Sequence, residues 1–291
     1  MTVANASAPP TRVPPGRLVV PTRTGATITV AGMSFKIVTW NVDWWNRSKA
    51  SVADRIALLG ELDADVAALQ EVRGRQVPSY EKTGPSVFGS AFKRGENTSQ
   101  WMLSGLVFRR GTTIEESGLI PLPYRDQRAV WARAMLPGTA QRITFLSWHS
   151  QHGVHIPAAE KGAMFDAVSE WLVAQAGPVV AGCDINTWTD PVDLVVADPD
   201  HDYASENRFV GPDPEHGLVD VYRSHLQNIG TLEELRRSSP EGPLCLSHSG
   251  TPTRRDRIFA SPELAVLDSG YERERGFALS DHAPHWAVLS E

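Results

Sequence analysis

The sequence contains little cysteine and no long apolar run. Only two cysteines, Cys183 and Cys245, occur among 291 residues, and they form neither a CxxC motif nor a spacing typical of metal ligands. This excludes a small disulfide-stapled scaffold and indicates free thiols, so we expect a cytoplasmic protein. No stretch approaches the roughly 18 apolar residues of a membrane span, and residues 1–32 lack the apolar core of a secretory signal. We therefore expect neither membrane insertion nor secretion.

The sequence also lacks a strong excess of charge of either sign. Its 28 Lys and Arg against 34 Asp and Glu give a formal net charge of −6. Binding of long duplex DNA is dominated by neutralisation of phosphates, so this balance argues against a protein that holds such DNA by charge alone. A chain of this length buries about three quarters of the surface that its unfolded form exposes, and it therefore needs no structural metal to fold.

The chain shows no internal repeat and no linker within its main body. Residues 1–32 are rich in Pro, Ala, Thr and Gly and predict a flexible appendage, with one short strand at Thr27–Val30. Residues 33–291 predict one domain in which apolar strands alternate with amphipathic segments. Predicted strands include Phe35–Trp40, Asp65–Glu71, Ser99–Arg109, Ala129–Leu136, Ile143–Trp148, Pro178–Ala181, Asp256–Phe259 and His285–Leu289. A long helix is predicted at Pro157–Ala176, and residues 189–254 appear irregular except for a helical patch at Leu232–Arg237.

Several predicted strands end in carboxylates, carboxamides or imidazoles. If these strands lie side by side, their ends share one rim, which would suit a hard divalent cation because such ions prefer oxygen ligands. The histidines of the rim are suited to proton transfer. The polar segments are Asn41-Val42-Asp43, Gln70-Glu71, His149, Asp184-Ile185-Asn186, Asp256 and Ser280-Asp281-His282.

Each of these residues also has a simpler interpretation when it is taken alone. Asn41 could cap a turn, and Glu71 could be a solvated strand end. Asp281 and His282 could form a surface pair. Their occurrence together, each at the end or start of a predicted strand, favours a shared site over six independent coincidences.

Six of these segments, in this order, resemble the endonuclease/exonuclease/phosphatase superfamily, which includes DNase I, apurinic endonucleases, inositol polyphosphate 5-phosphatases and neutral sphingomyelinases. The resemblance runs from about Phe35 to Leu289. It implies a four-layer α/β sandwich of two packed, mostly antiparallel β-sheets flanked by helices, with residues 33–291 as the catalytic domain. The matching segments are Trp40-Asn41-Val42-Asp43, Leu69-Gln70-Glu71-Val72, Ser147-Trp148-His149, Gly182-Cys183-Asp184-Ile185-Asn186, Asp256-Arg257-Ile258 and Ser280-Asp281-His282-Ala283-Pro284.

The resemblance implies a divalent-metal-dependent phosphoesterase that hydrolyses a P–O bond with water as the nucleophile. Magnesium or manganese would be the cofactor, with Glu71 as principal ligand and Asp43 and Asp281 in support. The other implied roles are phosphate binding by Asn41 and Asn186, orientation or deprotonation of water by Asp184, phosphoryl contact or proton transfer by His282, orientation of that imidazole by Asp256, and catalysis by His149, which matches a histidine of DNase I-like members.

The sequence departs from the DNase I pattern next to His149. DNase I pairs its first catalytic histidine with a glutamate, and no clear counterpart of that residue is found here. Glu96 is the nearest candidate, and the strand around Met102 offers no acid. Within residues 124–128, one arginine could reach the substrate phosphate, although a surface position is the simpler expectation.

The charge of the segment Thr189–Thr253 favours a small substrate. A cluster of acids near a metal pocket would repel a polyanion, so we expect a monomeric enzyme that acts on a compact phosphoester or a single-stranded end in preference to duplex DNA. The acids are Asp190, Asp193, Asp198, Asp200, Asp202, Asp213, Glu215 and Asp220, and the basic residues Arg223, Arg236, Arg237 and Arg254 follow later. Trp44, Trp45 and Trp188 could stack on a ring or base, or pack the core.

Three alternatives remain open from the sequence. The first is a DNase I-like or exonuclease-like nuclease with a nucleic acid substrate. The second is a non-catalytic member that uses the same fold for binding, because a fold alone does not fix a function. The third is a zinc hydrolase built on His149, His152 and His155, although no HExxH motif or cysteine partner accompanies these histidines.

Overall fold

The computed structural model describes residues 33–43, 45, 49–89, 102–123, 128–150, 157–187, 204–211, 213–238, 244–250 and 253–291, together with the backbone of residues 19–21 and 27–29. The chain divides into two compact units, Met1–Gly32 and Met33–Glu291. In the first unit, β1 (Val19–Pro21) pairs antiparallel with β2 (Thr27–Thr29), which confirms the short strand predicted there. None of the helices in the described ranges has the length and apolar character that crossing a membrane requires.

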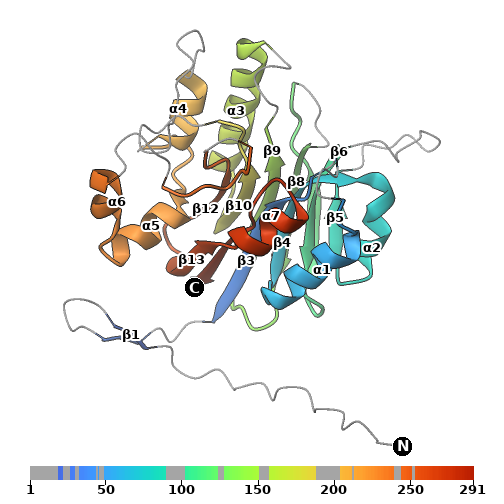
Figure 1. Ribbon diagram of the computed structural model, residues 1–291, viewed down its shortest axis with the longest axis horizontal. Helices are drawn as coiled ribbons and strands as arrows, with labels where there is room; N and C mark the ends of the chain where they lie inside the picture. The colour runs from blue at the N-terminus through green and yellow to red at the C-terminus, as the bar shows by residue number, and fades with distance from the viewer. Residues whose placement is uncertain are drawn as a thin grey trace, which may run out of the picture. The chain divides into compact units, whose positions relative to one another are not determined.

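Two sheets of six strands each, counted over the described residues, form the second unit (Figure 1). In spatial order, the first sheet consists of β13 (Ala265–Tyr271), β14 (His285–Ser290), β3 (Ser34–Asn41), β4 (Val66–Arg73), β6 (Met102–Phe108) and β5 (Ser86–Phe88). The second sheet consists of β11 (Val219–Asp220), β12 (Asp256–Ala260), β10 (Val179–Asp184), β9 (Ile143–His149), β8 (Ala129–Met135) and β7 (Thr113–Leu119). Neighbouring strands run antiparallel in both sheets except at β3–β4 and β9–β10, which are parallel.

A helical crossover connects each parallel pair. Helix α1 (Val52–Glu61) joins β3 to β4 and begins at a capping box in which the Ser51 hydroxyl accepts from the Asp54 N–H and the Asp54 carboxylate accepts from the Ser51 N–H. Helix α3 (Ala158–Val173) joins β9 to β10. Because parallel strands end at the same edge of a sheet, each crossover brings two polar strand ends together.

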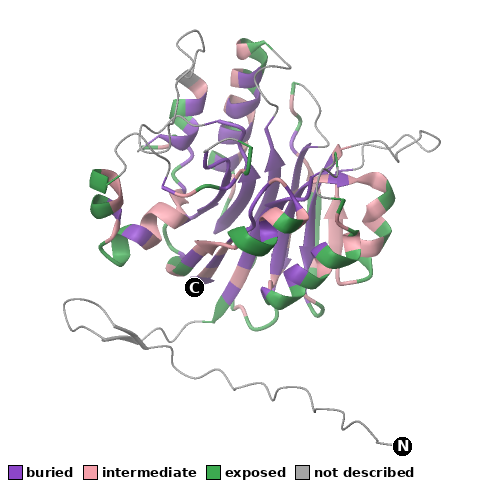
Figure 2. Cartoon of the chain, in the orientation of Figure 1, coloured by how far each residue is buried: buried purple, intermediate pink, exposed green. Residues whose placement is uncertain are grey.

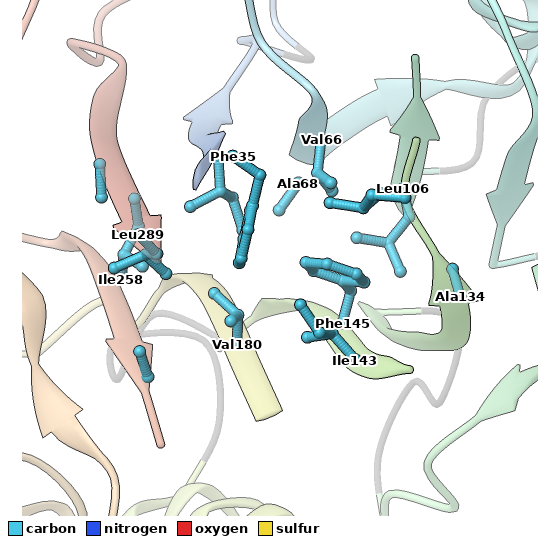
Figure 3. Packing of buried hydrophobic residues seen from close by; sticks show 14 of the residues in the cluster. Phe35, Val66, Ala68, Leu106, Ala134, Ile143, Phe145, Val180, Ile258 and Leu289 are labelled. Carbon is cyan, nitrogen blue, oxygen red and sulfur yellow. The ribbon is translucent and has the colours of Figure 1, made fainter. Parts of the chain in front are cut away.

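The main hydrophobic core lies between the two sheets. Figure 3 shows side chains of the first sheet, such as Phe35 and Leu106, opposite Phe145 and Val180 of the second. The Phe145 ring meets Phe35 edge-on at 6.0 Å and Phe108 edge-on at 5.6 Å between centroids. Face-to-face packing of two sheets is thus established by interlocked aromatic and aliphatic side chains.

Helices cover the outer faces of both sheets. Leu58 and Leu59 of α1 pack with Trp40 and Leu69 on the outer face of the first sheet, together with α2 (Val77–Glu81) and α7 (Arg273–Leu279). Phe165 of α3 and residues of α4 (Ala204–Val210) pack on the outer face of the second. Figure 2 shows buried strands between helices whose outer surfaces are exposed. This confirms the predicted four-layer α/β sandwich.

The region 189–254 contains more regular structure than the sequence predicts. The helix predicted at Leu232–Arg237 is present as α6 (Leu232–Ser238), but α4, α5 (Val221–Asn228) and β11 were not predicted. Asp220 caps α5 by accepting from the Arg223 N–H at 3.1 Å. Phe209 of α4 packs against Trp148 and Phe165. These helices are too short for a periodic pattern, and tertiary contacts and caps stabilise them instead.

Candidate active site

The two sheets approach each other closely beside the polar strand ends. Gln70 is fully buried, and its Nε2 donates to Thr39 Oγ1 at 3.0 Å and to Ser147 Oγ and the Gly182 carbonyl at 3.2 Å. A Cβ on Gly182 would lie 2.6 Å from the Ala68 Cβ, which is closer than carbon atoms can pack. Glycine at 182 and a satisfied amide at 70 therefore let the sheets meet here.

Asp184 lies at the centre of the polar cluster and is fully buried. Asn41 Nδ2, from the first sheet, donates to Asp184 Oδ2 at 2.8 Å. The same oxygen lies 3.6 Å from His149 Nε2 and 3.9 Å from His282 Nε2. The ends of β3, β9 and β10 and the segment before β14 thus meet at one carboxylate, which two imidazoles flank.

His282 forms a hydrogen-bonded pair with Asp256. Its Nδ1 lies 2.8 Å from Asp256 Oδ2, and Asp256 begins β12 directly opposite Asp184. Burial alone would lower the pKa of His282, but the nearby carboxylates of Asp256 and Asp184 outweigh it and raise this pKa to about 10. Burial alone would raise the pKa of Asp184, but its neighbours, chiefly His282, hold it below its ordinary value. At neutral pH the cluster therefore combines a cationic imidazole with an ionised carboxylate.

Residues 38–282 match the sequence model of the Endonuclease/Exonuclease/phosphatase family. The chain belongs to this family. The matched region runs from β3 to His282 and therefore contains the whole cluster described above. No curated protein matches the sequence significantly.

Solved structures share the fold at low sequence identity. TDP2 from D. rerio, crystallised with a single-strand DNA product, superposes with a TM-score of 0.61 at 17% identity over 89% of this chain and 99% of its own. The APE2 catalytic domain from Xenopus laevis gives 0.60 at 20% identity, covering 87% of this chain and 91% of that one. An AP endonuclease from Archaeoglobus fulgidus gives 0.56 at 19% identity, covering 87% and 98%. These likenesses establish the fold.

Three residues of the cluster have a left-handed backbone conformation, which residues other than glycine rarely adopt. The φ angles are 57° at Asp43, 58° at Glu71 and 46° at Asn186. Among the described non-glycine residues, Lys49 and Asp63 are the others with positive φ. Glu71 lies where the register between β4 and β6 shifts. Unfavourable backbone conformations are thus concentrated where this cluster's polar side chains are oriented, as is common at functional sites.

Neighbouring side chains fix the amide orientation of Asn186. Its Oδ1 accepts from Arg255 Nη1 at 3.2 Å, and its Nδ2 donates to the Ser150 carbonyl at 2.9 Å. The buried Lys161 donates to the Asn186 carbonyl at 3.0 Å and pairs with Glu206. The Asn186 Nδ2 then faces His149 Nε2 at 3.1 Å. Neither Arg255 nor Lys161 was singled out from the sequence, although Arg255 stands directly before the Asp256 motif.

Arg128 is not at the surface, contrary to the simpler expectation from the sequence. It is 3% exposed, and its Nη1 lies 3.2 Å from His149 Nδ1. Strand β8 begins at the next residue and pairs with β9, so Arg128 lies beside the end of β9 that carries His149. The sequence indicates an arginine near the phosphate but not its contact with the histidine, because that contact joins two strands.

The carboxylates expected to bind metal differ in their exposure to solvent. Asp43 is buried, whereas the side chains of Glu71 and Asp281 are 15% and 18% exposed. The Asp43 N–H donates to Asn41 Oδ1 at 3.0 Å, and Glu71 Oε1 lies 3.6 Å from His149 Nε2. Three carboxylates that include two solvent-accessible ones are a donor set suited to a hydrated hard cation, which takes oxygen ligands and keeps several waters. By chemistry these residues suit a magnesium-type ion, but their carboxylate oxygens do not all lie within 4.8 Å of one another, so direct binding by all three would need side-chain movement or bridging water.

Two groups of potential ligand atoms lie within 4.8 Å of one another in the described residues: His248, Asp281 and His282, and Asp184, Asp256 and His282. In the second group, the His282 Nδ1–H is hydrogen-bonded to Asp256 Oδ2, so that nitrogen is not a metal ligand. In the first group, His248 Nδ1 accepts from the Gly250 N–H at 2.9 Å, so the ring proton is on Nε2 and that nitrogen offers no lone pair. Neither group contains Glu71 or Asp43.

Part of the acidic segment proves to be structural. Asp220 is buried against Arg254 and Arg257, with Oδ2 at 2.6 Å and 3.2 Å from their guanidinium nitrogens, and both arginines are fully buried. Asp220 and Arg254 were counted among the charges of the segment expected to face the substrate. Because both side chains are buried, they do not contribute to the surface charge. Trp45 is exposed at 62%. Other residues named from the sequence lie outside the described ranges: Trp44, Trp188, Glu96, His152, His155, Asp190, Asp193, Asp198, Asp200 and Asp202.

Proposed function

We propose that this protein is a divalent-metal-dependent phosphoesterase that hydrolyses a phosphate ester P–O bond with water. The observation that carries the proposal is the arrangement at Asp184, where an ionised buried carboxylate lies between two imidazoles and accepts from Asn41. Such an arrangement can accept a proton from water on one side while N–H groups stabilise phosphoryl oxygens on the other.

Asp184 is the group best suited to orient and deprotonate water. Its pKa lies below the ordinary value, so at rest it is ionised and accepts hydrogen bonds. It is fully buried, which strengthens its interaction with a bound water dipole. The water would lie within hydrogen-bond distance of Asp184 and in line with the bond to be broken.

His282 is suited to contact the phosphoryl group as a cation. Asp256 holds its Nδ1–H, which leaves the Nε2–H to donate to a phosphoryl oxygen. Asn41 and Asn186 each have a second amide N–H beyond the one that fixes their orientation. These donors would stabilise the negative charge that develops on the nonbridging oxygens during attack.

Glu71, Asp43 and Asp281 would hold Mg²⁺ or Mn²⁺. When bound, the cation supplies neutralisation of charge on the phosphoryl oxygens. The left-handed backbone at Glu71 and Asp43 supports this assignment. Holding these side chains in place costs conformational energy, and such strain is concentrated at functional sites.

The substrate is proposed to be a compact phosphoester or a single-stranded nucleic acid end rather than duplex DNA. The net charge of −6 and the acids of segment 189–253 support this preference, although Asp220 no longer contributes to it. The single-strand DNA product bound to D. rerio TDP2 makes a single-stranded end the nucleic acid candidate to test first.

The test is a substrate panel assayed with magnesium, with manganese, and after EDTA treatment. The panel compares plasmid DNA, single-stranded oligonucleotides, nucleotides, sugar and inositol phosphates, and phospholipid headgroup esters. We expect turnover that EDTA abolishes and added magnesium restores, greatest on a small or single-stranded substrate. Efficient plasmid degradation at physiological salt without turnover of small esters would make the protein a duplex nuclease. Binding without turnover of any substrate would favour a non-catalytic member, and EDTA-resistant bound zinc would favour a zinc hydrolase.

A further inference from the structure

The environment of His149 is unusual because N–H donors face both of its ring nitrogens. Arg128 Nη1 lies 3.2 Å from Nδ1, and Asn186 Nδ2 lies 3.1 Å from Nε2. A guanidinium has five N–H donors and no acceptor, so Nδ1 must accept in its contact with Arg128. A neutral imidazole then carries its single proton on Nε2.

The acceptors around Nε2 agree with this placement of the proton. Glu71 Oε1 and Asp184 Oδ2 each lie 3.6 Å from Nε2. The Asn186 amide cannot turn its oxygen to the ring without losing its bonds to Arg255 and the Ser150 carbonyl. With the proton on Nε2, these two carboxylates are its acceptors at 3.6 Å, and Asn186 Nδ2 at 3.1 Å is a second donor that faces it. Because donors face both ring nitrogens, either tautomer leaves one donor opposite another, and the contact with a neutral amide costs less than one with a cationic guanidinium. The opposite tautomer would point an Nδ1–H at the guanidinium.

Arg128 is itself held in place by the first sheet. Ser104 Oγ of β6 donates to the Arg128 carbonyl at 2.8 Å, and Arg128 Nη2 donates to the Met102 sulfur. Met102 begins β6, the strand that offers no acid partner for His149. A cation therefore contacts His149 Nδ1.

We propose that Arg128 is a positioning residue that fixes His149 as the neutral Nε2–H tautomer. This inference rests on the proposed phosphoesterase function. His149 then acts as a fixed hydrogen-bond donor toward the phosphoryl group and has no Nδ1–H with which to engage a carboxylate. In this respect it is the reverse of His282, whose Nδ1 donates to Asp256.

The tautomer can be measured without any substrate. The full chain is labelled with ¹⁵N-histidine, and long-range proton–nitrogen correlations of the imidazole rings are recorded with and without magnesium. The His149 signals are assigned by their loss in His149→Asn. We expect a protonated Nε2 and an unprotonated Nδ1. A protonated Nδ1 in the wild-type chain would overturn the proposal, and this test needs no folded Arg128 variant.

Variants test whether Arg128 is the cause. Arg128→Met removes the donors and is expected to shift His149 toward the Nδ1–H tautomer and to lower kcat about 10–100-fold, with a smaller change in KM. Arg128→Lys keeps a cationic donor and should retain the Nε2–H pattern and most of the activity. Arg133→Met is the matched control and should change neither, because Arg133 lies in β8, which Arg128 directly precedes, and pairs with Glu116. An unchanged His149 spectrum in Arg128→Met would refute the positioning role.

Failure of the wider proposal has a different outcome. A wild-type chain that turns over no phosphoester would end the proposed function, while the ring spectra would still report whether Arg128 sets the tautomer. A phosphoesterase whose His149 carries its proton on Nδ1 would instead end this inference alone.

Discussion

The two sheets of the sandwich repeat one pairing pattern, with a parallel pair flanked by antiparallel pairs, yet they bring different chemistry to the site. The first sheet contributes Asp43 and Glu71, which offer carboxylate oxygens, and Asn41, which donates an N–H to Asp184. The second contributes His149, Asp184 and Asp256, which hold and accept protons. A repeated backbone pattern thus determines where side chains meet, and the residue at each strand end determines what they can do there.

His282 connects the two sheets. It precedes β14 of the first sheet, but its imidazole bonds to Asp256 of the second. Trp40 Nε1 donates to the His282 carbonyl at 2.9 Å, and Ser280 Oγ donates to the Asn41 carbonyl at 2.7 Å. The segment that carries this histidine is therefore held by one sheet while its ring serves the other. If the comparison is correct, variants of the second sheet should change turnover, and those of the first should change metal dependence.

The largest effect is expected for Asp256→Asn. Replacing the carboxylate on His282 Nδ1 permits the wrong tautomer, so kcat should fall about 10³–10⁴-fold. The pKa of His282 should fall from about 10 toward its ordinary value in an NMR titration. The magnesium concentration for half-maximal activity should stay unchanged. Asp268→Asn removes a carboxylate from a half-exposed pair with His225 and serves as the control. If Asp256→Asn lowered kcat no more than Asp268→Asn does, the assignment would be wrong.

Glu71→Gln tests the first sheet. It removes a charged oxygen ligand while keeping the shape of the side chain, so half-maximal activity should need about 10–100-fold more magnesium. Turnover at saturating magnesium should recover in part. Activity is measured across a magnesium titration, with Glu116→Gln on the outer strand β7 as the control. An unchanged magnesium requirement would remove Glu71 from the metal site.

Gly182→Ala tests the contact between the sheets. The new Cβ would meet the Ala68 Cβ at 2.6 Å and the Thr39 Cβ at 2.9 Å, so we expect unfolding free energy to fall by about 1–3 kcal/mol. Gly60→Ala, in the exposed part of α1 with no atom within 4 Å, should instead raise it by about 0.5–1 kcal/mol. Urea unfolding of both variants measures whether the unfolding free energy falls in Gly182→Ala and rises in Gly60→Ala. Equal effects would mean that the sheets can separate freely at Gly182.

The smallest effect concerns His285 of the first sheet, which handles no proton at the site. It is fully buried, and burial lowers its pKa from 6.5 to about 3. Because the folded state keeps the ring neutral, this contribution to stability is complete above pH 6.5 and is lost progressively as pH falls toward 3. At pH 5.5 the loss should be about 1.4 kcal/mol.

The measurement for His285 is urea unfolding at pH 7.5 and 5.5, repeated with His285→Gln. The variant loses the contact with the Ser269 hydroxyl at 2.9 Å and should be less stable at both pH values, but its stability should depend less on pH. An identical pH dependence in the two chains would show that other groups cause it.

The sequence predicted the ends of β3, β9 and β10 because short apolar runs, buried on both faces, stop there where polar residues begin. Val130, Ala132, Ala134 and Leu136 alternate and are all buried, as expected for one face of β8 and its continuation. Asn41 and Asp184 could be placed at strand ends for the same reason. Their 2.8 Å contact follows from the packing of one sheet on the other.

Partners that come from distant parts of the chain could not be predicted in the same way. Arg128 and Arg255 touch His149 and Asn186 through the arrangement of strands, and nothing in their local sequence distinguishes them from surface arginines. Asp220 was counted as a surface acid because its charge is visible in the sequence, whereas its burial between Arg254 and Arg257 is not. Composition reports charge, and only the fold reports where that charge is neutralised.

The left-handed backbone at Asp43, Glu71 and Asn186 makes these positions visible to an experiment that knows nothing of the substrate. Glycine adopts such a conformation without steric cost, whereas Glu71 holds it at a cost of about 1–3 kcal/mol. A library of variants selected for resistance to heat or protease should therefore enrich glycine at residue 71. Positions at which selection for stability replaces the natural residue by glycine would then mark the active site from folding data alone.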